Sequence, residues 1–481
     1  MKNKQKEKNV RVRFAPSPTG YLHIGNLRAA IFNWLFAKHH GGKFLIRVED
    51  TDLQRSKQEY KDYMLASLAW MGIDYDEPIV TQSERVDVHK KMIDRLIQEG
   101  KAYRCFCTDQ ETEQRKKEAS GYDDLFSGYD GFCYSRRSED IDVKRPFVVR
   151  FRLPRDKKAV VFEDLIRGTI QVDIDQFDDF IIARSDGTPM YNLAVVVDDD
   201  FMKVTHIIRG EDHISNTPKQ IMLCEAFGFT LPKFAHVPLI LGPSGDKLSK
   251  RDAAVSVLDY RDQGFLPEAL LNYLVRLGWS HGDQEVFSKK ELISYFDLDH
   301  VGKTGAIFDI DKLLWLNGVY MRDMPAENLK EIIAKDLAVD FQKRFSFWNE
   351  QQMVKLIGLY KERTKTLQEL LECLDLLYKG PEEYELAAFE RWVTEKTSTH
   401  LEQLISTLAQ QDQFEHDLLA TTIKNLCKDI GIKLVALAQP IRLSLTGSSA
   451  SPGIFELLEI VGKQESLRRL ERFLNFIQRK K

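Results

Sequence analysis

The clearest indication of the fold class is the stretch Arg13-Phe-Ala-Pro-Ser-Pro-Thr-Gly-Tyr-Leu-His-Ile-Gly-Asn26. Val10–Phe14, which overlaps the start of this stretch, predicts a strand, and the apolar spacing over Asn26–Lys38 predicts a helix that stops at Gly41-Gly42. In a doubly wound sheet, the first strand-to-helix turn is where a nucleotide phosphate meets a helix N-terminus. The stretch therefore predicts a phosphate-binding loop with His23 as a donor. Taken alone, the loop is better explained as an ordinary strand, loop and helix with a capping histidine, and the phosphate-binding interpretation depends on a second motif.

The pattern around this stretch alternates between short β-rich runs and amphipathic runs up to about residue 260. This order predicts a parallel, doubly wound sheet of the Rossmann type. Four short strands separated by turns interrupt it and predict an inserted α+β domain. Further strands of the sheet are expected at Phe44–Val48, Val204–Ile208 and Val237–Leu241. The helices beside them are expected at Ser56–Met71, Glu84–Gln98 and Pro218–Phe227. The four strands of the insertion are expected at Val148–Leu153, Val160–Phe162, Thr169–Val172 and Phe180–Ala183.

The chain changes character from about Pro267, where strand patterns fade. Helical spacing then predicts an all-α region that follows the α/β part. The clearest helical segments are Leu270–Leu277, Met353–Tyr360, Leu367–Leu377 and Leu401–Leu408.

The composition excludes several classes of protein. The 481 residues carry a formal net charge of −4, which by itself does not indicate a nucleic-acid binder. Apolar runs such as Leu193–Val197 are only strand-sized, far below the roughly 18 residues of a membrane span. Six cysteines are too few for a disulfide framework. The lysine-rich N-terminus has no apolar segment of a secretory signal, so we expect a cytoplasmic protein with no membrane contact.

A second motif, Gly245-Asp-Lys-Leu-Ser-Lys-Arg251, follows an apolar strand at the expected edge of the same sheet. A run of charges is usually a solvated face. Here, however, Lys247 and Lys250 are mobile cations in a flexible loop, and such cations suit a polyphosphate whose charge grows in a transition state.

Together the two motifs resemble a known family. His23-Ile-Gly-Asn26 resembles the HIGH signature of class I aminoacyl-tRNA synthetases, and Lys247-Leu-Ser-Lys-Arg251 resembles their KMSKS loop. The departures from these signatures are of the kind seen in the glutamyl and glutaminyl branch. From Val10 to Phe473 the chain is similar to bacterial glutamyl-tRNA synthetases, most clearly at Arg13–Gly20, Arg47–Asp52, Tyr191–Asp199, Ile208–His213, Leu445–Gly447 and Ser451–Gly453.

This resemblance implies an ATP-dependent ligation of L-glutamate to the 3′ end of tRNA(Glu) through glutamyl-adenylate, with release of AMP and diphosphate. It implies catalysis by His23, Lys247 and Lys250 with Mg²⁺. The glutamate pocket would hold Arg13, Ser17, Glu49, Tyr191 and Arg209, and the ATP site would hold His23, Gly25, Asn26, Asp212, Lys247 and Lys250. It further implies a monomer with catalytic halves at residues 10–104 and 186–260, an acceptor-binding insertion at 105–185, a stem-contact connector at 261–324 and a helical anticodon-binding domain at 325–481.

The chemistry of glutamate agrees with the expected pocket. Two carboxylates require guanidinium forks, and the ammonium requires an acidic group. Arg13, Arg209 and Glu49 end separate β segments at one edge of the expected sheet. From the residues alone, an Arg13–Glu49 ion pair between two strands fits equally well, and the resemblance favours binding.

A group of cysteines resembles the zinc knuckle of some bacterial members of the family. Zinc takes four ligands, and Cys105, Cys107 and Cys133 supply three thiolates. Where a histidine or aspartate often follows, this chain has Ser135, which is a poor ligand. Either Tyr129 fills the fourth position or the site is lost. We expect one structural Zn²⁺ bound by the three cysteines and Tyr129. The alternative is that the cysteines bind no metal and serve only as small residues of the core.

Rival functions are less consistent with the sequence. A glutaminyl-tRNA synthetase usually carries a β-barrel anticodon domain, and a truncated paralogue that modifies a tRNA base lacks the C-terminal region. A non-catalytic RNA-binding relative is expected to have lost His23, Lys247 and Lys250. A dehydrogenase needs a GxGxxG turn that is absent here. Whether tRNA(Gln) is charged as well depends on a few anticodon-side residues, with Arg363 and Lys365 in a candidate segment.

Overall fold

The computed structural model describes residues 7, 9–52, 54–119, 129–135, 145–246, 248 and 256–480, without the side chains of 116–119. The chain divides into two compact units. The first comprises Met1–Asp259 and Leu270–Ile310, and the second comprises Tyr260–Ala269 and Asp311–Lys481.

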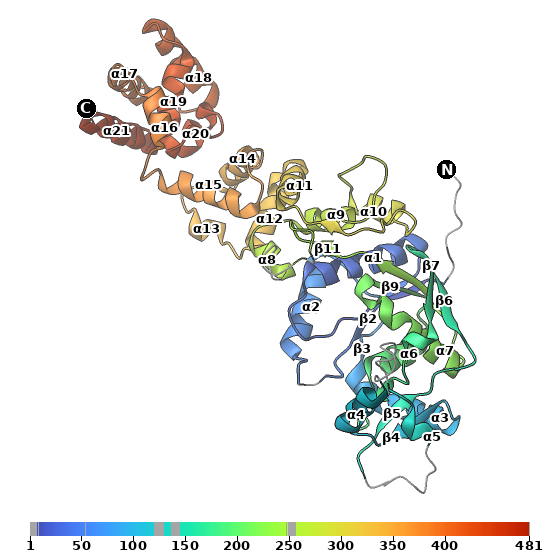
Figure 1. Ribbon diagram of the computed structural model, residues 1–481. Coiled ribbons are helices and arrows are strands. Elements are labelled where there is room, and N and C mark those ends of the chain that lie inside the picture. Colours follow the sequence, from blue (N-terminus) through green and yellow to red (C-terminus); the bar gives the residue numbers. More distant parts are fainter. Residues whose placement is uncertain are drawn as a thin grey trace. The chain divides into compact units, whose positions relative to one another are not determined.

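The first unit is built on parallel strands (Figure 1). Strands β1 (Arg11–Phe14), β2 (Lys43–Val48) and β3 (Val80–Thr81) pair in parallel in the order β1-β2-β3. Strands β9 (His206–Gly210) and β10 (Lys233–Val237) also pair in parallel. The backbone N–H of Thr205 donates to the carbonyl oxygen of Arg11 at 2.9 Å, which brings β9 beside β1. The resulting order, β3-β2-β1-β9-β10, confirms the expected Rossmann-type sheet.

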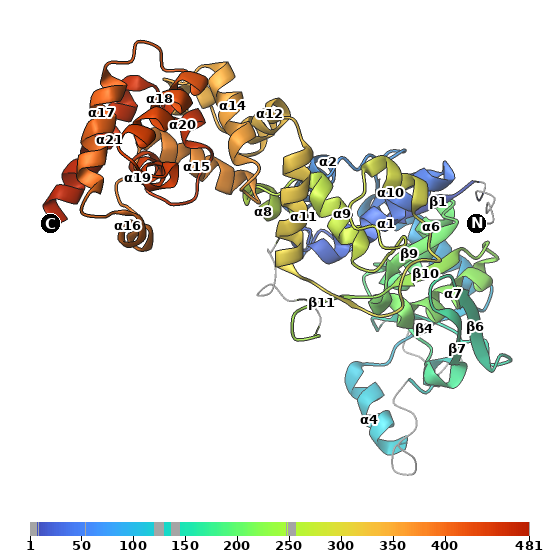
Figure 2. The ribbon, with the colours of Figure 1, turned by 90° about the horizontal axis from the view of Figure 1, so that it is seen from above.

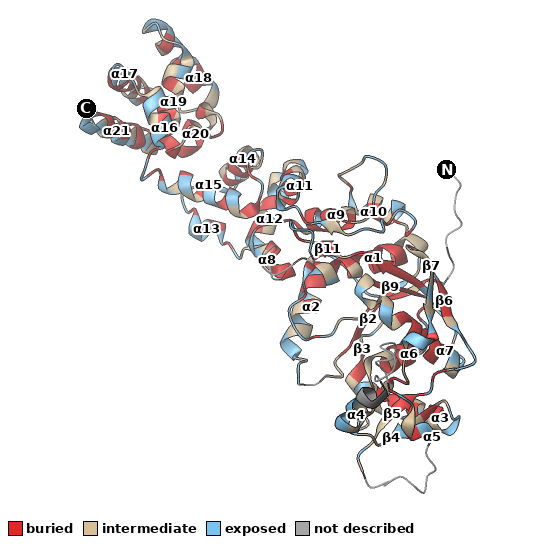
Figure 3. Ribbon diagram, in the orientation of Figure 1, coloured by how far each residue is buried: buried red, intermediate tan, exposed pale blue. Residues whose placement is uncertain are grey.

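Helix α1 (Ile24–His40) packs on β1, β2 and β9. Figure 3 shows α1 and β9 buried along most of their length, which fits a helix that is apolar on nearly all sides. Gly41 ends the helix in the left-handed conformation at φ 66°, as the sequence predicted. A Cβ atom on Gly42 would lie 2.3 Å from the carbonyl oxygen of Val10, so this close approach of helix end and β1 requires glycine.

One apolar run differs from the expectation. The run Val237–Leu241 is not one strand, because β10 ends at Val237 and Pro238 has no N–H to continue the ladder. The remaining elements of the first unit outside the insertion are α2 (Gln58–Trp70), η1 (Gln82–Arg85), α3 (Val86–Gln98), α6 (Tyr191–Phe201), η4 (Glu211–Asn216), α7 (Thr217–Phe227), β11 (Ile240–Leu241), α10 (Lys289–Tyr295) and β12 (Ala306–Ile307), while α8 (Val257–Asp262) and α9 (Pro267–Arg276) cross the boundary between the units.

The insertion is α+β, as expected. Strands β4 (Ala102–Cys105), β5 (Val148–Phe151) and β8 (Ile181–Ala183) form an antiparallel sheet. Strands β6 (Ala159–Asp164) and β7 (Gly168–Asp173) form a hairpin, and β6 also pairs with β10 at Asp164 and Phe234. The hairpin therefore continues the Rossmann-type sheet. The helices of the insertion are α4 (Asp109–Ala119), α5 (Phe132–Ser135) and η3 (Ile174–Gln176).

The described part of the second unit contains only helices, which confirms the expected all-α region. Figure 2 shows α17 to α21 gathered around a common core, to which Leu401, Leu437 and Leu470 contribute fully buried side chains. The helices are α11 (Ile310–Asp323), α12 (Ala326–Asp336), α13 (Phe341–Arg344), α14 (Glu350–Tyr360), α15 (Leu367–Lys379), α16 (Leu386–Trp392), α17 (Thr397–Ala409), α18 (His416–Asp429), α19 (Leu434–Thr446), α20 (Ile454–Val461) and α21 (Lys463–Lys480). Among the described residues, no helix combines the length and apolar character needed to cross a membrane.

Candidate active site

A cavity of about 330 Å³ opens where the parallel strands end. The carboxyl ends of β1, β2, β9 and β10 all contribute to its walls, as expected for the ligand site of an open α/β sheet. The structure brings together nine of the eleven residues expected there: Arg13, Ser17, His23, Gly25, Asn26, Glu49, Tyr191, Arg209 and Asp212. Lys247 and Lys250 lie outside the described residues, although Leu248 between them lines the cavity.

Five charged side chains form a cluster at one wall of the cavity. This charged cluster consists of Arg13, Arg47, Glu49, Asp199 and Arg209. Arg13 pairs with Asp199 at 3.1 Å and not directly with Glu49, whereas Arg47 contacts both Asp199 and Glu49, the latter at 3.0 Å. Three guanidinium groups face two carboxylates, so the charged cluster has one positive charge in excess.

The acids of the charged cluster respond differently to their surroundings. Burial raises the pKa of Glu49 even though Arg47 opposes that change. For Asp199 the balance reverses, because the guanidinium groups of Arg13 and Arg47 outweigh burial and hold its pKa below the ordinary value. Asp199 is therefore a fixed anion that holds Arg13, which lines the cavity, and the fully buried Arg47 behind it.

Arg47 and Asp199 were not among the site residues predicted from the sequence, although both lie in motifs that resemble the family. Arg47 stands within an apolar run and Asp199 two residues after one, and both are buried. A charged residue in or near an apolar run is the signal in the sequence that could have found them. Such a residue is buried only when it is paired, so it indicates a buried ion pair.

Arg209 is the member of the charged cluster without an acidic partner. Its Nη2 donates to Thr217 Oγ1 at 2.8 Å, and its Nε donates to His236 Nε2 at 3.2 Å. In the described part of the chain, no carboxylate lies within ion-pair distance of it, and its Nη1 is buried without a hydrogen bond. Burial lowers the pKa of Arg209 to about 10, which still leaves it charged at neutral pH.

Tyr191 reaches the cavity from the first turn of α6. Its hydroxyl lies 3.2 Å from Nδ1 of His213. Burial, assisted by the Arg209 charge, lowers the pKa of His213 to about 4, so this ring is neutral at neutral pH. Because the His213 imidazole is neutral, it adds no charge to the charged cluster, whose excess positive charge stays on Arg209.

His23 occupies the N-terminus of α1. Its Nδ1 accepts the backbone N–H of Gly25 at 3.1 Å, which confirms the capping interpretation, and the exposed ring also lines the cavity. A Cβ atom on Gly25 would lie 3.0 Å from the His23 ring. Glycine at this position therefore leaves the histidine room to cap the helix and face the cavity at once.

Comparison with known proteins identifies the family. Residues 9–315 match the family model "tRNA synthetases class I (E and Q), catalytic domain", and residues 326–474 match "Anticodon binding domain". A protein named glutamate–tRNA ligase from Geobacter sulfurreducens is 46% identical over 473 residues, covering 98% of this chain and 99% of the relative. The chain belongs to the glutamate–tRNA ligase family.

Further members of the glutamate–tRNA ligase family agree over nearly the full length. The protein of that name from Thermodesulfovibrio yellowstonii is 44% identical over 469 residues, covering 97% of this chain and 99% of its own. A crystal structure of a glutamate tRNA ligase from Elizabethkingia meningosepticum, in complex with its amino acid, matches with a TM-score of 0.85 and 33% identity, covering 97% of this chain and 99% of that chain. These matches confirm the resemblance and the expected fold.

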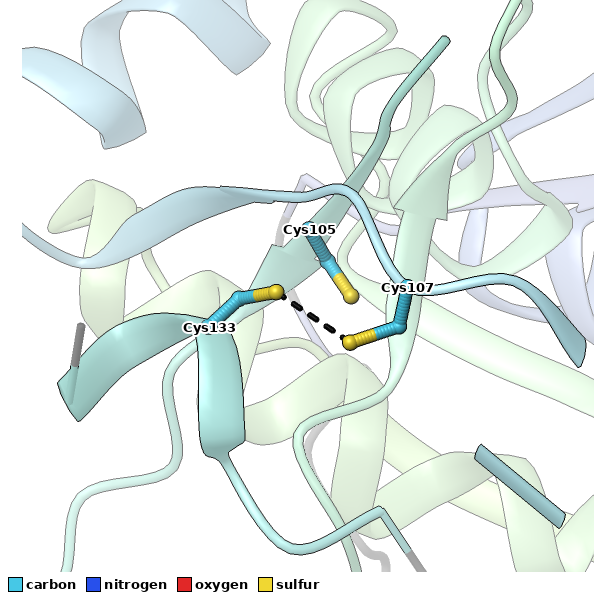
Figure 4. Close-up of side chains that lie close together, drawn as sticks. All are labelled: Cys105, Cys107 and Cys133. Atoms are coloured by element: carbon cyan, nitrogen blue, oxygen red, sulfur yellow. Dashed lines mark hydrogen bonds between the residues drawn. The ribbon is translucent and has the colours of Figure 1, made fainter. Parts of the chain in front are cut away.

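This member of the glutamate–tRNA ligase family also has a cysteine cluster in its insertion. Figure 4 shows the sulfur atoms of Cys105, Cys107 and Cys133 pointing towards one another, and they lie within 4.8 Å of one another. The hydroxyl of Tyr129 lies 3.5 Å from Cys107 Sγ and accepts the backbone N–H of Cys133 at 2.8 Å. Ser135 instead donates to the Phe132 carbonyl at 3.0 Å. The cluster thus contains the four donors expected from the sequence.

Proposed function

We propose that this chain ligates L-glutamate to the 3′ end of tRNA(Glu) in two steps that consume ATP. In the first step an α-carboxylate oxygen of glutamate attacks the α-phosphorus of ATP, which forms glutamyl-adenylate and releases diphosphate. In the second step a hydroxyl of the terminal ribose of the tRNA attacks the activated carbonyl and AMP leaves. No protein nucleophile is required, so catalysis consists of positioning and charge stabilisation.

The observation that carries this proposal is the charge of the cavity wall. Glutamate at neutral pH has two carboxylates and one ammonium, so it carries one net negative charge, and glutamine carries none. The charged cluster has one positive charge in excess, on Arg209. We assign a glutamate carboxylate to Arg209, the ammonium to Glu49, and further polar contacts to Arg13, Ser17 and Tyr191.

The nucleotide would occupy the helix end of the same cavity. His23, Gly25 and Asn26 lie at the N-terminus of α1, where backbone N–H groups favour a phosphate. We place Asp212 on this side as well, and from the sequence we add Lys247 and Lys250. ATP enters as its complex with Mg²⁺, which neutralises part of the phosphate charge.

We further propose how the chain divides its work on tRNA. The insertion, 105–185, would hold the acceptor end between catalytic halves at 10–104 and 186–260, residues 261–324 would contact the stem, and the helices of 325–481 would read the anticodon. The anticodon model matched over 326–474 supports the last assignment. We expect a cytoplasmic monomer that charges tRNA(Glu), and charging of tRNA(Gln) in addition is the open alternative.

The test of the proposed function is aminoacylation of purified tRNA(Glu) and tRNA(Gln), with glutamate and glutamine offered to each. We expect charging with glutamate, and a kcat/KM for glutamine that is lower by about 100-fold or more, because glutamine would leave a buried guanidinium unpaired. Comparable charging with both amino acids would contradict the assignment. The two tRNAs report separately on the anticodon preference.

We also propose that the cysteine cluster holds one structural Zn²⁺ through Cys105, Cys107, Cys133 and Tyr129. In a tetrahedral zinc site the sulfur atoms lie about 3.8 Å apart, close to the spacing seen here. Cys107 and Cys133 lie 3.2 Å apart, so a bound ion would separate them slightly. When bound, the ion would tie the two halves of the insertion together.

Two cations support an anionic donor set. Arg115 Nη2 donates to Cys107 Sγ at 2.8 Å, and the guanidinium of Arg150 lies 3.8 Å from the centre of the Tyr129 ring. Three thiolates and one zinc ion leave a net negative charge, and a phenolate adds to it. Nearby guanidinium groups offset that charge and favour the deprotonated ligands.

For the zinc proposal we expect about one zinc per chain in protein purified without chelators. Replacing Cys133 by serine should remove most of the metal and lower the melting temperature, because the binding free energy of a structural ion contributes to folding. Cys373→Ser, at a half-buried cysteine outside the cluster, is the matched control and should leave the metal content unchanged. Absence of zinc, with unaltered stability of Cys133→Ser, would refute the proposal.

A further inference from the structure

Behind Arg209, away from the cavity lining, lies a buried pair of side chains that the proposed chemistry does not use. His236 on β10 and Asp164 at the end of β6 are both fully buried, and His236 Nδ1 lies 2.6 Å from Asp164 Oδ2. On its other side, His236 Nε2 accepts the Nε–H of Arg209 at 3.2 Å. Neither residue belongs to the lining of the cavity. The imidazole therefore connects a buried carboxylate to the guanidinium that faces the substrate.

The surroundings of Asp164 fix the tautomer of His236. Asp164 Oδ1 accepts the backbone N–H groups of Ile166 at 3.0 Å and Arg167 at 2.9 Å, and Oδ2 accepts that of His236 at 3.1 Å. A carboxylate that only accepts requires a proton on His236 Nδ1. Burial keeps the pKa of His236 below its ordinary value despite Asp164, so the ring is neutral. A neutral ring with its proton on Nδ1 has a bare Nε2, which can accept from Arg209.

A neutral acceptor has a specific advantage beside Arg209. A carboxylate in the place of the imidazole would orient the guanidinium equally well, but it would neutralise the charge that the substrate carboxylate needs. The imidazole orients Arg209 Nε, and Thr217 Oγ1 accepts a hydrogen bond from Nη2. Thr217 Oγ1 also lies 3.1 Å from Nε2 of the imidazole. The guanidinium is thus held by two neutral groups and keeps its full charge for the ligand.

We propose that Asp164 and His236 are positioning residues that fix the orientation of Arg209 for a carboxylate of glutamate and thereby set the affinity and selectivity for that amino acid. The inference rests on the proposed role of Arg209 in binding glutamate. Asp164 acts through the tautomer of His236, and His236 acts through the hydrogen bond to Arg209 Nε. Neither contacts substrate.

The variant Asp164→Asn tests the tautomer directly. In the place of Oδ1 the amide NH₂ would oppose the backbone N–H groups of Ile166 and Arg167, whereas in the place of Oδ2 it opposes only that of His236, so the NH₂ takes the place of Oδ2 and faces His236 Nδ1. The ring must then accept at Nδ1 and carry its proton on Nε2, where it opposes the Nε–H of Arg209. We expect the KM for glutamate in ATP–diphosphate exchange to rise by about 10–100-fold, with the KM for ATP within about twofold of wild type.

Two substitutions of His236 separate positioning from a merely structural role. The amide oxygen of glutamine can reach the place of Nε2 and accept from Arg209, whereas asparagine reaches only the place of Nδ1. We expect His236→Gln to keep the KM for glutamate within about fivefold and His236→Asn to raise it about as much as Asp164→Asn. Equal effects of the two substitutions would overturn the inference. This pair also decides the matter if Asp164→Asn fails to fold.

Arg209→Ala distinguishes failure of the inference from failure of the proposed function. If Arg209→Ala leaves the KM for glutamate unchanged, the assignment of Arg209 is wrong and the inference falls with it. If Arg209→Ala raises that KM while Asp164→Asn and both His236 variants leave it unchanged, only the positioning role is overturned. The expected result is a rise in Arg209→Ala, Asp164→Asn and His236→Asn, with His236→Gln close to wild type.

Discussion

Replacing Arg209 by alanine should raise the KM for glutamate by about 10²–10³, because the substrate carboxylate then enters a buried site without its ionic partner. The structure supports an effect of this size, since no carboxylate among the described residues lies within ion-pair distance of Arg209, and its buried Nη1 has no hydrogen-bond partner there. ATP–diphosphate exchange at varied glutamate measures the change, and the KM for ATP should remain within about twofold.

The control for Arg209→Ala is Arg11→Ala, at the start of β1, the end of that strand away from the cavity. Arg11 forms an ion pair with Glu77 at 2.8 Å and is partly exposed, so its loss should leave the KM for glutamate unchanged. The preference of Arg209→Ala for glutamate over glutamine should also shrink, because glutamine no longer leaves a guanidinium unpaired. An unchanged preference would place the discriminating group elsewhere in the cavity.

The variant Asp199→Ala should lose about 3–5 kcal/mol of the free energy of unfolding, because the buried Arg13 then loses its ion-pair partner and the buried Arg47 keeps only Glu49. Asp199 is the partner of both Arg13 and Arg47, and all three side chains are buried. Denaturant unfolding at pH 7 measures the loss. Asp200→Ala removes the next residue of α6, whose carboxylate pairs at the surface with Lys203, and should cost only about 0–1 kcal/mol.

The pH dependence of this difference has a definite sign. The pKa of Asp199 is lowered in the folded protein, so its contribution is present above the unfolded value of about 3.9 and is lost as pH falls through the folded value. The gap in stability between wild type and Asp199→Ala should therefore be full at neutral pH and shrink in strong acid. A gap that persists unchanged in acid would mean that the carboxylate charge is not what stabilises the site.

Much of the catalytic edge could be predicted from the sequence, because strand ends in a parallel sheet converge on one side. Arg13, Glu49 and Arg209 were expected at one edge on this ground, and all three line the cavity. Local signals also located both ends of α1, since His23 caps one end and Gly41 closes the other. Helix ends depend on residues that are close together in the chain, so a single sequence is enough to predict them.

The residues that orient Arg209 could not be predicted in the same way. His236 and Asp164 meet it only through the pairing of β9 with β10 and of β10 with β6. The register between strands far apart in the chain is not encoded by local periodicity. Likewise, the apolar run at Val237–Leu241 looked like a strand by composition, whereas Pro238 and the pairing of β11 with β12 divide it.

The path of the chain between the two units has a consequence for recombining members of this family. Tyr260–Ala269 is grouped with the helical unit, although the following 41 residues, Leu270–Ile310, return to the first. Leu266 and Ala269 belong to the apolar core of the helical unit, and the N–H of Leu266 donates to Asn317 Oδ1 at 2.8 Å. A chimaera joined at a single crossover after residue 310 would thus mix two parental cores, and a faithful exchange must carry residues 260–269 as a second, separate graft.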